Sequence, residues 1–284
     1  QAEAVAHYRG LFLEGIYPPN APELDAWLQQ ERERWRLVAL TVLEHLSHEQ
    51  THAGKWDEAI ATLRRLLDLE PWREESHRLL MRLLASQGQF NAALVQYETC
   101  HRLLKAELGV EPMVQTTAVY ERIRAARQQT YHDKLPLYPT PLVGRAVEMG
   151  TLFTWLHDPK QRLVSLVGPG GSGKTRLAVA AASRHGYAFR DGVCFVPLAE
   201  TDNEASLVQT LAAALGLTLS AGAEKTQLFD YLRGKEMLLV LDNVEQALEQ
   251  VADLVVVLLN EAPHLCLLVT SREYLQLRSE TRLP

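Results

Sequence analysis

LVSLVGPGGSGKT, residues 163–175, decides how the C-terminal half of this chain folds. Four of its first five residues are apolar, as in a short buried strand, and they lead into a turn with four glycines. Lys174 and Thr175 follow, and the residues after them have a helical pattern. In such a turn, glycine lets successive backbone N–H groups point at phosphate oxygens, and the helix N-terminus adds positive potential. The stretch therefore predicts a phosphate-binding loop between a strand and a helix.

The pattern G-x-x-x-x-G-K-T also assigns roles to its side chains. Lys174 is expected to neutralise charge on the β- and γ-phosphates, and the Thr175 hydroxyl is expected to bind Mg²⁺. The expected ligand is ATP or ADP with Mg²⁺. Further contacts to the nucleotide are predicted from the rest of the loop: Gly168, Gly170, Gly171, Ser172, Gly173 and Arg176.

The same glycines satisfy a second motif. Gly168, Gly170 and Gly173 fit the dinucleotide fingerprint G-x-G-x-x-G. That site does not need a lysine directly after the last glycine, and Glu200, the nearest candidate for a ribose-binding acid, lies beyond the usual spacing of about 20 residues. Dinucleotide binding therefore stays as an alternative to ATP.

The rest of this half alternates strands and helices, which indicates a parallel sheet with helices on both faces. Ligands bind at the carboxyl ends of the strands in such a sheet. The expected fold is a three-layer α/β/α P-loop NTPase. Its strands are predicted at 163–167, 193–198, 237–241 and 265–270, and its helices at 205–215, 226–234 and 245–260.

Two of these strands end in charged residues. Asp242 ends an apolar strand at the Walker B position, where a buried carboxylate needs a cation, so we expect Asp242 and Thr175 to hold Mg²⁺. Arg272 follows the next strand and is expected to contact the γ-phosphate; a surface ion pair is the alternative. The predicted catalytic residues are therefore Lys174, Asp242 and Arg272.

Asn243 departs from the pattern of many hydrolysing P-loop proteins, which place a carboxylate directly after the Mg²⁺ aspartate. An amide cannot act as a base. We therefore expect slow ATP hydrolysis, unless Glu245 or a segment outside this sequence assists. Slow turnover suits a switch that changes its domain contacts with the bound nucleotide.

The N-terminal half contains an internal repeat. Gly54-x-Trp56-x-x-Ala59 aligns with Gly88-x-Phe90-x-x-Ala93, 34 residues later, which is the period of tetratricopeptide repeats. A helix is expected to begin near Asn20, with Trp27, Trp35, Val38 and Leu46 on its core side. The sequence predicts an all-helical TPR-like domain at 1–130, a proline-containing linker at 131–141, and the NTPase at 142–284.

Composition restricts the function classes further. The net charge of −6 argues against nucleic-acid binding by the whole surface. Three widely spaced cysteines indicate reduced core residues, and no apolar run is long enough to cross a membrane, so a cytoplasmic location is expected. The chain begins at Gln1, which suggests a fragment of a larger protein.

The helical half resembles the bacterial transcriptional activator domain of SARP-type antibiotic-pathway regulators. The resemblance rests on the Gly54 repeat and on two further stretches, LEPWREE from residue 69 and ELGVEP from residue 107. It implies a role in transcription control and contacts with transcription machinery or other proteins. DNA would be read only by a separate winged-helix domain, because this sequence offers no recognition helix.

The second half resembles the NB-ARC or STAND class of signalling ATPases, in the order VGR, GPGGSGKT, DGVCFVPLA, LLVLDNVE and LLVTSRE. The resemblance implies that Val143, Gly144 and Arg145 fold over the adenine. It also implies a helical subdomain and a winged helix after Pro284, and oligomerisation on activation. The expected function is therefore the ATP/ADP-binding core of a STAND-type transcriptional regulator. An interaction scaffold with structurally bound nucleotide and a metabolic P-loop enzyme are the alternatives.

Overall fold

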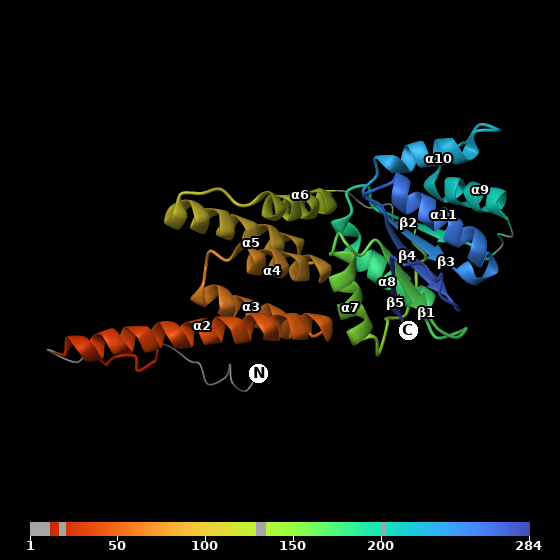
Figure 1. Ribbon diagram of the computed structural model, residues 1–284. Helices are drawn as coiled ribbons and strands as arrows, with labels where there is room; N and C mark the ends of the chain where they lie inside the picture. Colours follow the sequence, from red (N-terminus) through yellow and green to blue (C-terminus); the bar gives the residue numbers. More distant parts are fainter. Residues whose placement is uncertain (1–11, 17–20, 129–134, 200, 202) are drawn as a thin grey trace. The chain divides into compact units, whose positions relative to one another are not determined.

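The computed structural model describes residues 12–16, 21–128, 135–199, 201 and 203–284. The chain divides into two compact units, residues 1–85 with 89–120 and residues 86–88 with 121–284, and each is described by itself. The N-terminal part is helical, as predicted (Figure 1). Its α-helices are α2 (Pro22–His52), α3 (Trp56–Leu69), α4 (Glu74–Ser86), α5 (Phe90–Leu103) and α6 (Val114–Gln128).

The predicted repeat is visible in the backbone. Gly54 and Gly88 each have a positive φ, +69° and +75°, a conformation that a side chain disfavours. Ala59 and Ala93, five residues after each glycine, are completely buried, which lets the paired helices approach closely. The amide after each glycine donates to the carbonyl five residues earlier at 2.9 Å: Lys55 to Gln50, and Gln89 to Leu84.

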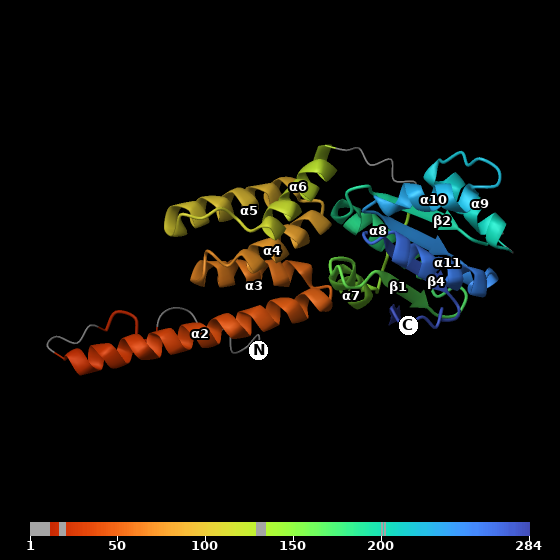
Figure 2. The same cartoon turned by 45° about the horizontal axis from the view of Figure 1, so that its top comes forward.

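The prediction that Trp27, Trp35 and Val38 lie on the core side of α2 is wrong. Trp27, Trp35 and Val38 are each more than two-fifths exposed, whereas Leu46 is buried as predicted. The reason is length, because α2 has 31 residues and α3, which packs against it, has 14 (Figure 2). The helix begins at Pro22, and Asn20 lies outside the described residues. The leucines that form the buried face are Leu28, Leu40, Leu43 and Leu46.

The second unit is the predicted α/β fold. Its five strands run parallel in the order β2-β3-β4-β1-β5. The four predicted strands lie within one residue of their expected bounds, and β5 was not predicted. The bounds are β1 (Leu163–Val167), β2 (Val193–Pro197), β3 (Leu238–Asp242), β4 (Cys266–Ser271) and β5 (Glu280–Leu283).

Helices cover both faces of this sheet (Figure 1). α7 (Ala146–Leu156) and α8 (Lys174–His185) lie on one face. The other face carries α9 (Glu204–Leu215), α10 (Glu224–Arg233) and α11 (Leu248–Glu261), and these three helices share one apolar core with the sheet. None of the described helices combines the length and apolar character needed to cross a bilayer.

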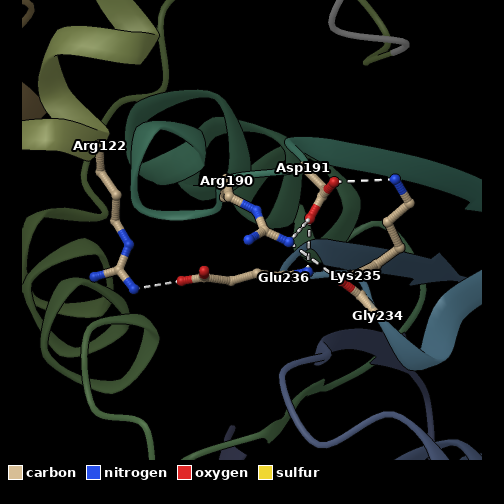
Figure 3. Close-up of polar contacts among 6 residues, drawn as sticks. All are labelled: Arg122, Arg190, Asp191, Gly234, Lys235 and Glu236. Atoms are coloured by element: carbon tan, nitrogen blue, oxygen red, sulfur yellow. Dashed lines mark hydrogen bonds and ion pairs between the residues drawn. The ribbon is translucent and has the colours of Figure 1, made fainter. Parts of the chain in front are cut away.

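Polar side chains join the start of β2 to the start of β3 (Figure 3). The Asp191 carboxylate accepts hydrogen bonds from the Glu236 amide at 2.9 Å, from Lys235 at 3.0 Å and from Arg190 at 3.2 Å. Burial alone would raise the pKa of Asp191, but these contacts outweigh it and lower the pKa below its ordinary value. The two strands are thus held together at the end opposite the phosphate loop.

His185, the last residue of α8, is completely buried. Its ring makes an edge contact with Phe153, with the ring centres 5.5 Å apart. Burial, with a smaller contribution from the positive charge of Arg184, lowers the pKa of His185 to about 3. The imidazole is therefore neutral in the folded chain at pH 7 and throughout the mildly acidic range.

We expect this histidine to make folding sensitive to acid. Between about pH 6.5 and pH 3 the unfolded chain binds a proton that the folded chain does not, so stability falls as the pH falls. From pH 7.5 to 5 the loss from this group is about 2 kcal/mol. Urea unfolding of wild type and His185→Phe at both pH values measures it, with exposed His264→Gln as the control. An equal pH dependence in wild type and His185→Phe would contradict the prediction.

Candidate nucleotide-binding site

The loop from Gly168 to Gly173 joins β1 to α8, as the sequence predicts. Gly171 and Gly173 have φ of +76° and +89°, where a side chain would be strained, and α8 begins directly after Gly173. The Lys174 ammonium donates to the carbonyl oxygens of Gly168 at 2.8 Å and Pro169 at 2.9 Å. The loop thus combines left-handed glycines, a helix N-terminus and an ammonium group, which are the components of a phosphate cradle.

Asp242, the last residue of β3, lies next to this loop. It is 6% exposed, and its Oδ1 accepts a hydrogen bond from the Thr175 hydroxyl at 2.7 Å. The Thr270 hydroxyl, at the end of β4, also donates to Asp242. The structure therefore brings together Thr175 and Asp242, the two predicted metal ligands, although they are distant in sequence.

The end of β4 connects the loop to Asp242. Ser271 accepts a hydrogen bond from the Gly168 amide at 3.3 Å. Arg272 follows, and a Cβ atom added to Gly170 would be 3.5 Å from its guanidinium, so this predicted residue lies beside the phosphate loop. Arg272 forms an ion pair with Glu245, with Nε and Oε1 3.1 Å apart. An ion pair was the alternative expected for Arg272, and it lies next to the candidate site.

Arg145 ties the segment before α7 to the phosphate loop. Its guanidinium donates to the Ser172 carbonyl at 2.8 Å and pairs with Glu148, 2.5 Å away. Burial would raise the pKa of Glu148, but the hydrogen bond and charge of Arg145 lower it below its ordinary value. Gly144 has φ of +75°, and Val143 is 82% exposed. Arg145 therefore adjoins the loop, while Val143 makes little contact with the chain.

Arg176, also predicted to bind nucleotide, contacts the segment 138–141 of the predicted linker. Its guanidinium donates to the carbonyl oxygen of Thr140 at 2.8 Å and that of Pro141 at 3.2 Å. It also lies over the Tyr138 ring, 5.6 Å from the ring centre. The first turn of α8 thus holds the linker on one side and the phosphate loop on the other.

We expect Arg176→Ala to release this part of the linker. Charge-assisted hydrogen bonds contribute about 1.5–3 kcal/mol each when sheltered, and less at an exposed guanidinium such as this one. Cleavage of the linker by proteinase K should therefore speed up about tenfold, while ADP affinity stays within about threefold. Timed proteolysis with mass spectrometry measures the first quantity and titration calorimetry the second. Arg184→Ala, on the same helix, is the control, and equal cleavage rates in all three proteins would contradict the prediction.

A hollow beside the phosphate loop contains residues that the sequence did not predict. Leu283, the last residue of β5, and Pro284 line it together with the loop and Arg145. A four-residue edge strand with charged neighbours gives no clear pattern, so no signal in the sequence identified them. Thr270 was a stronger candidate, because it ends the predicted apolar strand 265–270, two residues before Arg272.

The donor set fits a Mg²⁺-nucleotide. Mg²⁺ prefers oxygen ligands and is usually held by one or two carboxylates with hydroxyl, phosphate and water oxygens. The Thr175 hydroxyl and the Asp242 carboxylate supply such oxygens from adjacent elements, and Lys174 supplies the positive charge that phosphates need. Among the described residues there is no group of three or more His, Cys, Asp or Glu that could hold a metal without such a ligand.

These features define the second unit as a P-loop nucleotide-binding domain that follows a helical domain. The known families agree with both parts. Residues 1–124 match the family described as the bacterial transcriptional activator domain, and residues 146–275 match the NB-ARC domain, an ATP-binding P-loop family. The chain therefore carries these two domains in this order.

Curated relatives share one or both parts. The regulatory protein AfsR of Streptomyces griseus is 30% identical over 266 residues, covering 84% of this chain and 26% of that protein. AfsR of Streptomyces coelicolor has the same identity over 273 residues, with the same coverage. A Mycobacterium tuberculosis protein named among HTH-type transcriptional regulators is 43% identical over 122 residues, 43% of this chain and 14% of that protein. The chain thus spans between 14% and 26% of the length of these relatives.

Proposed function

We propose that this chain is the core of a transcriptional regulator in which the NB-ARC domain binds Mg²⁺-ATP or Mg²⁺-ADP as a switch. The observation that carries the proposal is the contact between Thr175 and Asp242 next to the Lys174 ammonium. A hydroxyl and a buried carboxylate at this place are the protein ligands that a nucleotide-bound Mg²⁺ requires. The relatives named as regulators support the transcriptional role.

Individual residues have defined parts in this proposal. Gly168, Gly170, Gly171, Ser172 and Gly173 supply backbone groups around the phosphates, and Lys174 neutralises their charge. Thr175 and Asp242 would hold Mg²⁺, which screens the phosphates and orients them. The adenine base is bordered by Val143, Gly144 and Arg145. Arg272 contacts the γ-phosphate, and the main role of Arg176 is to hold the linker. Because Asn243 replaces a carboxylate, hydrolysis is slow and each nucleotide state lasts.

The helical domain is proposed to carry the signal to protein partners. Paired helices of the TPR type present extended surfaces for other proteins or peptides, and transcription machinery is the partner class that the activator domain suggests. DNA contact belongs to another part of the regulator. The three free buried cysteines are compatible with a reducing cytoplasm, and assembly of several copies is the proposed consequence of ATP binding.

Titration calorimetry of the chain with Mg²⁺-ATP and Mg²⁺-ADP tests the binding step. We expect saturable binding of both nucleotides and no binding of NAD⁺. Binding of NAD⁺ would instead support the dinucleotide alternative. Hydrogen exchange of the two complexes tests the switch, because the linker residues 135–141 should differ in protection between ATP and ADP. Equal protection throughout the chain would contradict switching even if both nucleotides bind.

A structural role for the nucleotide is the second candidate, and Asn243 favours it because an amide cannot activate water. In that case ADP should remain bound through gel filtration and should not exchange. Chasing a fluorescent ADP derivative with excess ATP separates the two functions. Release over seconds to minutes supports the switch, whereas retention for many hours supports the scaffold. Transfer of phosphate to a small-molecule acceptor would instead indicate a metabolic enzyme.

A further inference from the structure

Asn243 directly follows Asp242, at the sequence position where many hydrolysing P-loop proteins have a carboxylate, and its backbone conformation is unusual. Its φ is +61°, in the left-handed region, which asparagine tolerates better than most residues. The Asn243 amide donates to the Thr270 hydroxyl at 3.1 Å, so this turn is fixed to the end of β4. A single 3₁₀ turn, Val244–Gln246, follows before α11 begins.

This turn brings Glu245 back to the carboxyl end of the sheet. Its Oε1 lies 3.1 Å from Nε of Arg272, the residue next to Gly170 of the phosphate loop. The sequence prediction of a helix starting at Glu245 is therefore wrong, because α11 begins at Leu248. A regular helix from Glu245 would have directed this side chain differently, so the left-handed turn determines where the carboxylate lies.

The two oxygens of the Glu245 carboxylate differ in their surroundings. Oε1 is engaged by Arg272, whereas Oε2 is buried and has no hydrogen-bond donor among the described residues. A buried hydrogen-bond acceptor without a donor is unfavourable, so buried carboxylate oxygens without a partner are uncommon. The carboxylate is thus held beside Arg272 by Oε1, and its other oxygen keeps its capacity to accept a proton or hydrogen bond.

We propose that Glu245 is the general base for ATP hydrolysis in this chain, in place of the carboxylate that Asn243 lacks; this rests on the proposed function. The water oxygen forms a bond to the γ-phosphorus, and the bond from that phosphorus to the bridging oxygen breaks. ADP leaves with the electron pair, and the water proton passes to the Glu245 carboxylate and then to solvent. Arg272 acts as a positioning residue for this carboxylate.

The test compares Glu245→Gln with the wild-type chain and with Glu249→Gln, an acidic residue in the first turn of α11. We expect single-turnover hydrolysis of Mg²⁺-ATP to fall about 100-fold in Glu245→Gln, because the amide cannot accept the proton. The affinity for Mg²⁺-ADP should stay within about threefold. The affinity for ADP–aluminium fluoride, which resembles the transition state, should fall about tenfold. Glu245→Asp, which keeps the charge, should recover part of both losses.

The outcomes separate this inference from the proposed function. If Glu245→Gln hydrolyses ATP and binds ADP–aluminium fluoride like wild type, Glu245 is not the base. A wild-type chain that binds both nucleotides but hydrolyses no ATP also overturns the inference, and leaves the switch in place. If wild type binds neither nucleotide, both proposals fail. Loss of ADP affinity in Glu245→Gln and Glu245→Asp alike, with unchanged thermal unfolding, would assign Glu245 a binding role instead.

Discussion

Replacing Lys174 with alanine is expected to weaken Mg²⁺-ATP binding by about 100-fold or more. The ammonium lies on the loop itself, bonded to the carbonyl oxygens of Gly168 and Pro169 at 2.8 and 2.9 Å. Phosphate oxygens compete well for such an ammonium, since charge-assisted hydrogen bonds contribute about 1.5–3 kcal/mol each. Two of them correspond to at least about a hundredfold in affinity at 1.4 kcal/mol per factor of ten. Titration calorimetry measures the dissociation constants directly.

The matched control for this variant is Lys160→Ala, which removes an exposed ammonium before β1. It should bind both nucleotides like wild type. Thermal unfolding without nucleotide shows whether losing the two carbonyl contacts disturbs the loop, and we expect a small change. If Lys174→Ala bound ATP within about threefold of wild type, the loop would not be using this lysine for phosphate, and the proposed function would lose its main support.

Replacing Arg162 with alanine should destabilise the second unit by about 3 kcal/mol. This residue precedes β1, and its guanidinium donates to three carbonyl oxygens at the end of α11 and in the following loop. Burial lowers its pKa from the ordinary value, which reflects how far the group is withdrawn from water. Alanine would leave three sheltered carbonyls without a donor, and hydrogen bonds to charged groups are among the stronger ones. The three acceptors are Leu259 at 2.8 Å, Ala262 at 2.5 Å and Leu265 at 3.2 Å.

Urea unfolding measures this loss as a lower midpoint at an unchanged slope. Arg278→Ala removes an exposed arginine from the same unit and should leave the midpoint unchanged. Arg162→Lys should recover only part of the stability, because one ammonium cannot reproduce a planar fork of donors. A loss below about 1 kcal/mol in Arg162→Ala would mean that water satisfies these carbonyls.

Much of the α/β unit could be predicted because three of its strands are fully buried. β1, β3 and β4 are short apolar runs next to glycine, aspartate or arginine, so their type was confirmed, and their bounds agree to within one residue. β5 has the opposite character, four residues at the edge of the sheet with two charged side chains, and it has no comparable pattern. The core face of α2 failed for another reason. Helical periodicity indicates which residues share a face, but not how far the neighbouring helix extends.

The candidate site was predictable where the chain order fixes geometry. The carboxyl ends of parallel strands meet at one edge, so Thr175 and Asp242 had to approach each other, and they do so at 2.7 Å. The positions of Arg176 and Glu245 depend instead on local backbone conformation and on the linker. A left-handed asparagine cannot be recognised from its residue type alone, since most asparagines have negative φ. The roles of Arg176 in binding and of Glu245 in catalysis remain predictions.

Two arginines attach the segment before α7 to the phosphate loop and to the first turn of α8. Arg145 of this segment donates to the Ser172 carbonyl, and Arg176 of α8 donates to the carbonyls of Thr140 and Pro141. Coupling of this kind is thermodynamically reciprocal. The factor by which a bound nucleotide strengthens the attachment of the linker equals the factor by which detaching the linker weakens nucleotide binding. The Arg176→Ala variant therefore measures both directions of this coupling in one affinity, which we expect to change no more than about threefold for ADP.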